Sequence, residues 1–244
     1  MNASASSAAS APSAADDRAT VLLRLLQLTD SALPVGAFSF SNGLETAVAE
    51  GLVHDAATLE AFTEDLLVQS AFTDGVAALH AHRSRLAGDV RGIVEADRYA
   101  FETRTGGEGR LMTCRMGRKL AELAARLFAD ALLDEWLEAL RAGVSPGTYP
   151  AAQGLVFAAS GIDERALFVS QQYGVASMAL NAALRCLRVS HYDTQRILFR
   201  LSERGGALYE EACVLALDEM HAFVPQIDIL ASLHEQGTQR LFMN

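Results

Sequence analysis

The sequence is poor in cysteine and has no long apolar run. Its three cysteines, Cys114, Cys186 and Cys213, stand far apart and form no CxxC pair, so we expect no disulfide framework. Each is expected to be a small core residue, and an odd count of this kind fits the reducing cytoplasm. No uninterrupted apolar stretch approaches the roughly 18 residues of a membrane span. We therefore expect a cytoplasmic protein that does not contact membranes.

Positive charge is also scarce. The 244 residues carry 30 acidic against 20 basic side chains, a formal net charge of −10, and Lys119 is the only lysine. Because cationic side chains hold nucleic acids and anionic membranes, this balance argues against both as partners. The region from Arg98 to Arg126 is nevertheless rich in basic residues: Arg98, Arg104, Arg110, Arg115, Arg118, Lys119 and Arg126. Such a region is either a solvated helix face with ion pairs or a surface that grips an acidic partner.

The sequence lacks the usual patterns of catalytic and metal-binding sites. No nucleophile has a paired base, no carboxylate pair has a catalytic context, and the six histidines are scattered. His80 and His82 are two residues apart on an expected helix, so they do not share a face. The glycine-rich segment 106–109 follows no strand pattern and precedes no GK[ST], so it is not a phosphate loop. We expect no catalytic residue, no cofactor and no metal site.

Helical periodicity, by contrast, is abundant. Apolar residues recur at helical spacing in almost every segment, and no stretch shows the alternation of β-branched residues that is typical of strands. The predicted fold is all-α, a single bundle-like domain of about ten helices at residues 20–28, 43–50, 55–87, 93–103, 110–130, 132–140, 151–159, 164–187, 193–203 and 207–223. We expect residues 1–19 to be a disordered Ala/Ser-rich leader, 20–234 the helical domain, and 235–244 a C-terminal tail that docks a partner.

The most distinctive stretch is residues 25–51, LLQLTDSALPVGAFSFSNGLETAVAEG. Pro34 and Gly36 predict a shaped link between two helices, and we expect Asn42 to cap the second helix. Taken alone, the link is a packed loop with two buried aromatic residues. Its order of residues, however, resembles the N-terminal signature of the urease accessory proteins of the F type. The matching residues are Asp30, Ala32, Leu33, Pro34, Gly36, Phe38, Ser39, Ser41, Gly43, Leu44 and Glu45.

Two segments in the middle of the chain extend this resemblance. Residues 116–120, MGRKL, are similar to the family's second conserved region. Further on, a polar stripe is expected on an apolar helix, because Tyr173, Ser177, Asn181 and Arg185 are spaced by four. The family has an Asn-Ala-x-x-Arg stretch here, followed by a Pro-Leu-Gly-Gln turn. This chain keeps the stretch, reads Val-Ser-His at 189–191 instead of the turn, and matches again at Asp193, Gln195 and Arg196.

A third signature lies at the C-terminus, where the chain ends QIDILASLHEQGTQRLFMN. The residues that match the family are Pro225, Asp228, His234, Glu235, Arg240, Leu241 and Phe242. A tail with so few apolar residues can pack back on the core, or it can be a docking element that orders on binding. We expect it to have too few apolar residues to bury stably without a partner.

The resemblance, which covers about residues 22–242, implies a urease maturation factor that is not an enzyme. Such proteins form homodimers, join the D-type (also called H-type) accessory protein, and recruit the G-type GTPase that carries nickel to apo-urease. The partner-binding residues that we expect from it are Pro34, Gly36, Phe38, Ser39, Gly43, Glu45, Arg118, Tyr173, Asn181, Arg185, Gln195, His234, Arg240, Leu241 and Phe242.

The alternative is a helical ligand-binding or regulatory protein without catalytic activity. A transcription factor would need a helix-turn-helix with a basic recognition helix, whereas Glu108 and Glu122 interrupt the basic region of this chain. Urease and GTPase partners in a pull-down would support the maturation factor. A small metabolite or an operator sequence would support the alternative.

The sequence also yields a prediction about nickel. Carboxylate, His and Cys side chains are present, but no spacing brings three or four of them together. The isolated, tag-free protein should therefore bind nickel only weakly. Isothermal titration calorimetry tests this, and a submicromolar nickel site would contradict it.

Overall fold

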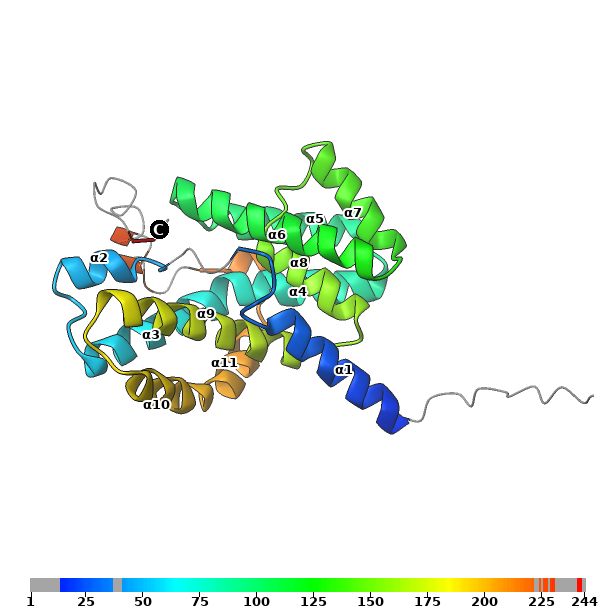
Figure 1. Ribbon diagram of the computed structural model, residues 1–244. Coiled ribbons are helices and arrows are strands. Elements are labelled where there is room, and N and C mark those ends of the chain that lie inside the picture. The colour runs from blue at the N-terminus through cyan, green and yellow to red at the C-terminus, as the bar shows by residue number, and fades with distance from the viewer. Residues whose placement is uncertain are drawn as a thin grey trace, which may run out of the picture.

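A computed structural model describes residues 14–36, 41–221, 224, 226, 227, 229, 230, 241 and 242. The described part of the chain is helical and contains no strand, which confirms the all-α prediction (Figure 1). No helix within it is long and apolar enough to cross a bilayer. The elements are α1 (Ala14–Thr29), α2 (Leu44–Ala49), α3 (Ala56–Ser70), η2 (Ala71–Gly75), α4 (Val76–Ala87), α5 (Val90–Glu102), α6 (Gly107–Leu127), α7 (Ala131–Arg141), α8 (Tyr149–Ala159), α9 (Glu164–Cys186), α10 (His191–Ser202), α11 (Gly205–Ala212) and the 3₁₀ turn η3 (Leu217–Glu219).

The longest predicted helix, residues 55–87, is confirmed in its extent and is divided by a π-helical turn. Asp55 caps its start by accepting a hydrogen bond from the Thr58 N–H (2.8 Å), and Gly88, with φ +71°, ends it. Between α3 and α4 the backbone forms η2. Gly75 lies directly against the Phe168 ring, since a Cβ there would stand 2.6 Å from a ring carbon. Such turns insert an extra residue into a helix and occur often at functional sites.

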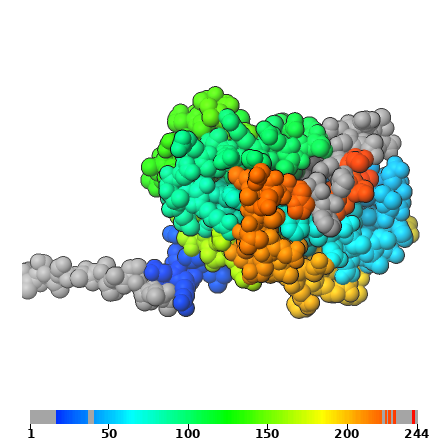
Figure 2. All heavy atoms as spheres, turned by 180° about the vertical axis from the view of Figure 1, so that it is seen from behind, coloured from blue at the N-terminus to red at the C-terminus, as the bar shows by residue number. Residues whose placement is uncertain are grey.

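The helices bury two apolar clusters, to which α4 and α9 both contribute. The first cluster joins α2, α3, α9, α10 and α11, and the second joins α5, α6, α7 and α8 with the C-terminal part of α1 (Figure 1). Helices α4 and α8 approach most closely, because residue 154 is glycine: a Cβ there would overlap the Ala78 carbonyl oxygen. Figure 2 shows α11 and the segment after it, in orange, on the back of the molecule, and the carbonyls of Cys213 and Leu215 in this segment contact Arg83 and His80 of α4.

Two predicted helix boundaries are wrong by more than three residues. Helix α1 begins at Ala14 rather than at Thr20, and α11 ends at Ala212 rather than at Phe223. The chain after α11 satisfies its backbone through tertiary contacts instead of helical ones. The His80 ring Nε2 lies 2.8 Å from the Leu215 carbonyl oxygen, and the His221 N–H donates to the Phe72 carbonyl (3.3 Å). These bonds compete with continuation of the helix.

His80 and His82 contact different elements, as their spacing predicts. His80 contacts the segment after α11, whereas the His82 ring Nε2 lies 2.8 Å from the Ile162 carbonyl oxygen at the start of the loop before α9. Each imidazole therefore ties α4 to a separate part of the chain. Within the described ranges, no three His, Cys, Asp or Glu side chains come together as a metal-binding group.

A buried carboxylate organises the loop before α8. Asp97, on α5, accepts hydrogen bonds from the Ser145 hydroxyl, the Gly147 N–H (2.7 Å) and the Thr148 N–H (2.6 Å). Burial raises the pKa of the Asp97 carboxyl, and these hydrogen bonds oppose the rise. The Trp136 indole donates to the same serine (3.1 Å), so α5, α7 and the loop are joined. No sequence pattern indicated this role of Asp97.

We expect Asp97→Asn to destabilise the protein. The substitution points an NH₂ group at one of the three donors, which leaves buried polar groups unpaired and should lower the free energy of unfolding by about 1–3 kcal/mol. Urea denaturation measures it. Glu95→Gln is the matched control, because Glu95 is exposed on the same helix and should change stability by less than about 0.5 kcal/mol. Equal effects of the two substitutions would contradict the role of Asp97.

Candidate interaction surface

The first signature forms a tight loop at the end of α1. The Asp30 carboxylate accepts from the Ala32 N–H (2.7 Å), and the Asp30 carbonyl accepts from the Leu33 N–H (3.0 Å). Val35 is buried, whereas Pro34 and Gly36 are exposed. Gly36 has φ +88°, and a Cβ there would lie 3.6 Å from the Lys119 Nζ. The loop thus brings the first signature against the MGRKL motif of α6.

The second half of this signature starts α2, but not with the predicted cap. Gly43, with φ +80°, occupies the N-cap position and is buried, so its direct contact with a partner is not available in this structure. Asn42 has φ +54°, and its amide donates to the Met178 sulfur of α9 (3.7 Å). The expectation that Asn42 caps the helix is therefore wrong. Phe38 and Ser39 lie outside the described residues.

Glu45 binds the third signature. Its carboxylate accepts from the Leu241 N–H (2.8 Å) and from the Phe242 N–H (3.2 Å). Hydrogen bonds from backbone amides to a carboxylate are among the stronger ones in proteins. The first and the last signature, nearly two hundred positions apart (|i−j| of 196 for the Leu241 bond), therefore meet directly.

Phe242 is part of the core in this structure. Its side chain is only 6% exposed, it belongs to the first apolar cluster, and the Arg185 guanidinium lies 4.5 Å from its ring centroid. The expectation that the tail cannot bury its apolar residues without a partner is wrong for Phe242, because Arg185 and Glu45 supply a prepared site. Leu241 is 56% exposed. His234 and Arg240 lie outside the described part of the chain.

Helix α9 carries the polar stripe that the sequence predicts. Tyr173 is 51% exposed, and Asn181 and Arg185 are exposed on the same face. The Asn181 amide donates to the Ser177 hydroxyl (3.4 Å), which continues the stripe along the helix. Its outer groups remain accessible to a partner.

This stripe is one wall of a groove of about 900 Å³. The opposite wall is the C-terminal half of α1 with the first signature loop, including Leu25, Leu33 and Val35. Gln195 of α10 and Phe242 close one end. Five of the predicted partner-binding residues therefore line one groove: Tyr173, Asn181, Arg185, Gln195 and Phe242.

Arg118 lies apart from the groove, on the exposed face of α6. Its Cγ would be 3.3 Å from a Cβ at Gly147, so its aliphatic stem runs along the loop that Asp97 holds. The backbone of the neighbouring Gly117 packs against the same loop, so closely that a Cβ on Gly117 would overlap the Gly147 carbonyl oxygen. The MGRKL motif is thus a helix-to-loop contact that leaves two cations exposed, Arg118 and Lys119.

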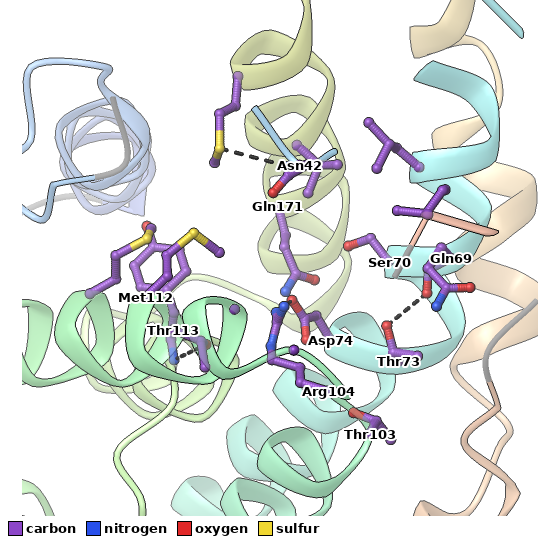
Figure 3. A pocket seen from close by; sticks show the side chains of 18 of the residues that line it. Asn42, Gln69, Ser70, Thr73, Asp74, Thr103, Arg104, Met112, Thr113 and Gln171 are labelled. Carbon is purple, nitrogen blue, oxygen red and sulfur yellow. Dashed lines mark hydrogen bonds and ion pairs between the residues drawn. The ribbon is translucent and has the colours of Figure 1, made fainter. Parts of the chain in front are cut away.

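A polar cavity of about 140 Å³ adjoins the groove and is lined by residues of η2, α6, α8 and α9. Figure 3 shows Ser70, Gln171 and the Asp74–Arg104 ion pair at this cavity. Among the described residues, the Ser70 hydroxyl and the Gln153 and Gln171 amide oxygens are buried without a hydrogen-bond partner. The volume exceeds the roughly 10–15 Å³ that one water needs, and these groups are suitable partners for water. Sequence reasoning missed this cavity, because its walls combine η2 and α6 with α8 and α9, which are far apart in the sequence.

The chain at residues 189–191, which differs from the family's turn, still leads into a capped helix α10. The Ser190 hydroxyl accepts from the Asp193 N–H (3.2 Å), and the Asp193 carboxylate accepts from the Ser190 N–H (3.0 Å). This reciprocal pair is a capping box, and it places Gln195 at the groove. The difference from the family pattern therefore keeps a defined helix start.

Comparison with known proteins identifies the family of this chain. The UreF family model matches residues 53–202. The chain is 48% identical to urease accessory protein UreF 2 of Brucella canis over 223 residues, 91% of this chain and 92% of that protein. It is 44% identical to urease accessory protein UreF of Yersinia pseudotuberculosis over 226 residues, 93% of this chain and 99% of that protein. This chain belongs to the UreF family.

Membership of the UreF family confirms the resemblance read from the three signatures, and the structure gives each of them a place. The loop at 30–36 borders both the groove and α6, Glu45 binds the C-terminal signature, and MGRKL fixes α6 against the loop before α8. None of the three needs a metal or a nucleophile to do this. Their roles in the described structure are packing and surface shape.

The contrast between neighbouring tail residues gives a test of this docking. Phe242→Ala removes a buried ring and its contact with Arg185, so the free energy of unfolding should fall by about 2 kcal/mol. Leu241→Ala, at an exposed side chain, should change it by less than about 0.5 kcal/mol. Urea denaturation compares the two variants. If both were neutral, the tail would not be docked in the free protein.

Proposed function

We propose that this chain is a non-catalytic urease maturation factor of the cytoplasm. In this role it is a homodimeric scaffold that joins the D/H-type accessory protein and recruits the G-type GTPase for nickel insertion into apo-urease. Family membership supports the general role, because this chain matches relatives named urease accessory proteins over nearly the whole length of both chains. The identity of the partners rests on the resemblance of the three signatures.

The observation that carries the scaffold role is the convergence of the signatures on one groove. Residues from α1, α9, α10 and the C-terminal signature meet there, although they are distant in the sequence. The groove combines an apolar wall with an exposed tyrosine and an exposed arginine, and these two residue types dominate binding energy at protein interfaces. We assign the groove to the D/H-type accessory protein.

Exposed leucines on α1 support association with further protein. Leu22, Leu23 and Leu26 are 55%, 67% and 57% exposed, and Leu26 reaches the rim of the groove. Neighbouring exposed leucines on a helix are a feature of interaction surfaces. A second copy or an accessory protein on this face would bury them.

The polar cavity supports a second candidate function, binding of a small ligand. Buried carboxamides without protein partners are typical of sites that hold water or a small polar molecule. Dialysis against candidate metabolites, followed by thermal denaturation, distinguishes this function from scaffolding. A ligand that stabilises the protein without affecting accessory-protein binding would favour it.

The groove assignment predicts the effect of a double substitution, Tyr173→Ala with Asn181→Ala. Loss of an exposed interface tyrosine costs about 2 kcal/mol, so affinity for the D/H-type accessory protein should fall about 30-fold and urease activation should fall with it. Calorimetry and urease activity in a strain that lacks the native protein measure both.

Tyr192→Ala is the matched control, because Tyr192 is 83% exposed on α10 and does not line the groove. Both variants should keep the melting temperature of the wild type. If the control weakened the complex as much as the double variant, the groove would not be the docking site. If the wild type bound no accessory protein, the scaffold role itself would be wrong.

A further inference from the structure

The outer face of α6 carries a stripe of charged residues. Arg115, Arg118, Lys119, Glu122 and Arg126 are all exposed. At about 100° per residue, their spacing places them on one face of the helix, and the stripe is about 17 Å long. It carries four positive charges and one negative charge, in a chain whose formal net charge is −10. We call these five residues the α6 stripe.

The four cations of the α6 stripe lie side by side on one helix, and no ion pair neutralises them within the described residues. Eight arginines elsewhere pair with carboxylates: Arg83, Arg85, Arg104, Arg141, Arg165, Arg196, Arg200 and Arg204. None of the four stripe cations does so within the described residues. A solvated helix face with its own ion pairs, which the sequence left open, is therefore not what the structure shows here.

The stripe is held on a rigid support. The opposite face of α6 buries Met112, Met116 and Leu120 in the second apolar cluster, and Gly117 lies against the loop that Asp97 anchors. Helix α6 therefore cannot turn its cations toward the acidic remainder of the chain. Because the helix that carries the charges is held in place before binding, no backbone ordering entropy is lost there when a partner docks.

The stripe also borders the candidate interaction surface. Gly36 of the first signature loop lies beside the Lys119 Nζ, and Val35 in the same loop lines the groove. Figure 1 shows the loop after α1 passing beside α6. A partner seated on the groove can extend across the loop onto α6.

We propose that the α6 stripe docks a row of carboxylates on a protein of the urease maturation complex. This inference rests on the proposed scaffold function and adds the chemistry of the partner's surface. Arginines make bidentate contacts with carboxylates, and the Arg115–Arg126 distance fits about three turns of a helix or a short loop.

A nucleic acid or another continuous polyanion fits the stripe less well. The stripe is short, the rest of the chain repels phosphates through its net charge, and Glu122 interrupts the row of cations. A protein surface can place a lysine or an arginine opposite Glu122, whereas a polyanion cannot. The mixed charge of the stripe therefore favours a protein.

The test reverses two charges at the ends of the stripe, Arg115→Glu with Arg126→Glu. Arg118 is left in place, because its stem packs against Gly147. Binding to the D/H-type accessory protein, the G-type GTPase and apo-urease is measured separately at about 50 mM and about 500 mM salt. We expect affinity for one of them to fall by at least about tenfold at low salt and the difference to shrink at high salt.

The control is Arg91→Glu with Arg188→Glu, which reverses two exposed arginines outside the stripe and the groove. It changes the net charge by the same amount and should alter binding less than about twofold. A helical peptide with glutamates spaced to face the stripe is a second probe that needs no urease protein. The wild type should bind it better than the reversed variant does.

Three results would decide between the explanations. The reversed, control and wild-type proteins could all bind the three urease proteins and the peptide equally well. That result would overturn the proposal that the stripe is a docking site. The wild type could bind none of the three proteins and yet bind the peptide better than the reversed variant does. That result would support the stripe's carboxylate chemistry and refute the scaffold function. If Glu122→Lys strengthened binding to heparin while neither stripe variant affected the protein partners, the stripe would be a polyanion site and the proposal would be wrong.

Discussion

The fold depends on the close approach of α4 and α8, which only a glycine at position 154 permits. Ala81 and the His82 backbone crowd the same point, so any side chain there would push the two helices apart. With α8 fixed in this way, the neighbouring Gln153 faces the polar cavity and the groove instead of α4. His82 extends the contact to the Ile162 carbonyl, just before α9 begins. The two apolar clusters and the surface between them are therefore set by one helix contact.

Two carboxylates give shape to segments that have no periodicity of their own. Asp97 gathers three donors of the loop before α8, and Glu45 gathers two amides of the C-terminal signature. In both cases one side chain satisfies backbone groups that would otherwise need water or a strand partner. Glu45 also lies in the first turn of α2, where a negative charge is favoured by the helix dipole. Phe242 is thus docked by Glu45, a residue that also stabilises α2.

The sequence was informative where local patterns decide the structure. Periodicity located the helices, and Asp55 caps the start of the long helix predicted at 55–87. Local patterns failed where distant groups are involved: the π-helical turn packs Gly75 against Phe168 of α9, and the chain after α11 bonds to His80 and Phe72 instead of continuing the helix. The stripe on α9 was predictable from its spacing by four. The groove was not, because its second wall comes from a loop more than a hundred residues earlier.

The groove and the cavity share side chains, and this bears on how a partner can bind. Tyr149, Gln153, Gln171 and Met178 line both. The amide oxygens of Gln153 and Gln171 have no hydrogen-bond partner in the described structure, so turning them toward the groove breaks no protein bond at those oxygens. Methionine adapts its shape at little cost, and Met178, which packs against the second apolar cluster, accepts only a weak hydrogen bond from Asn42. The wall behind the signatures can therefore adjust to a docked chain while Gly154, Asp97 and the apolar clusters keep the helices in place.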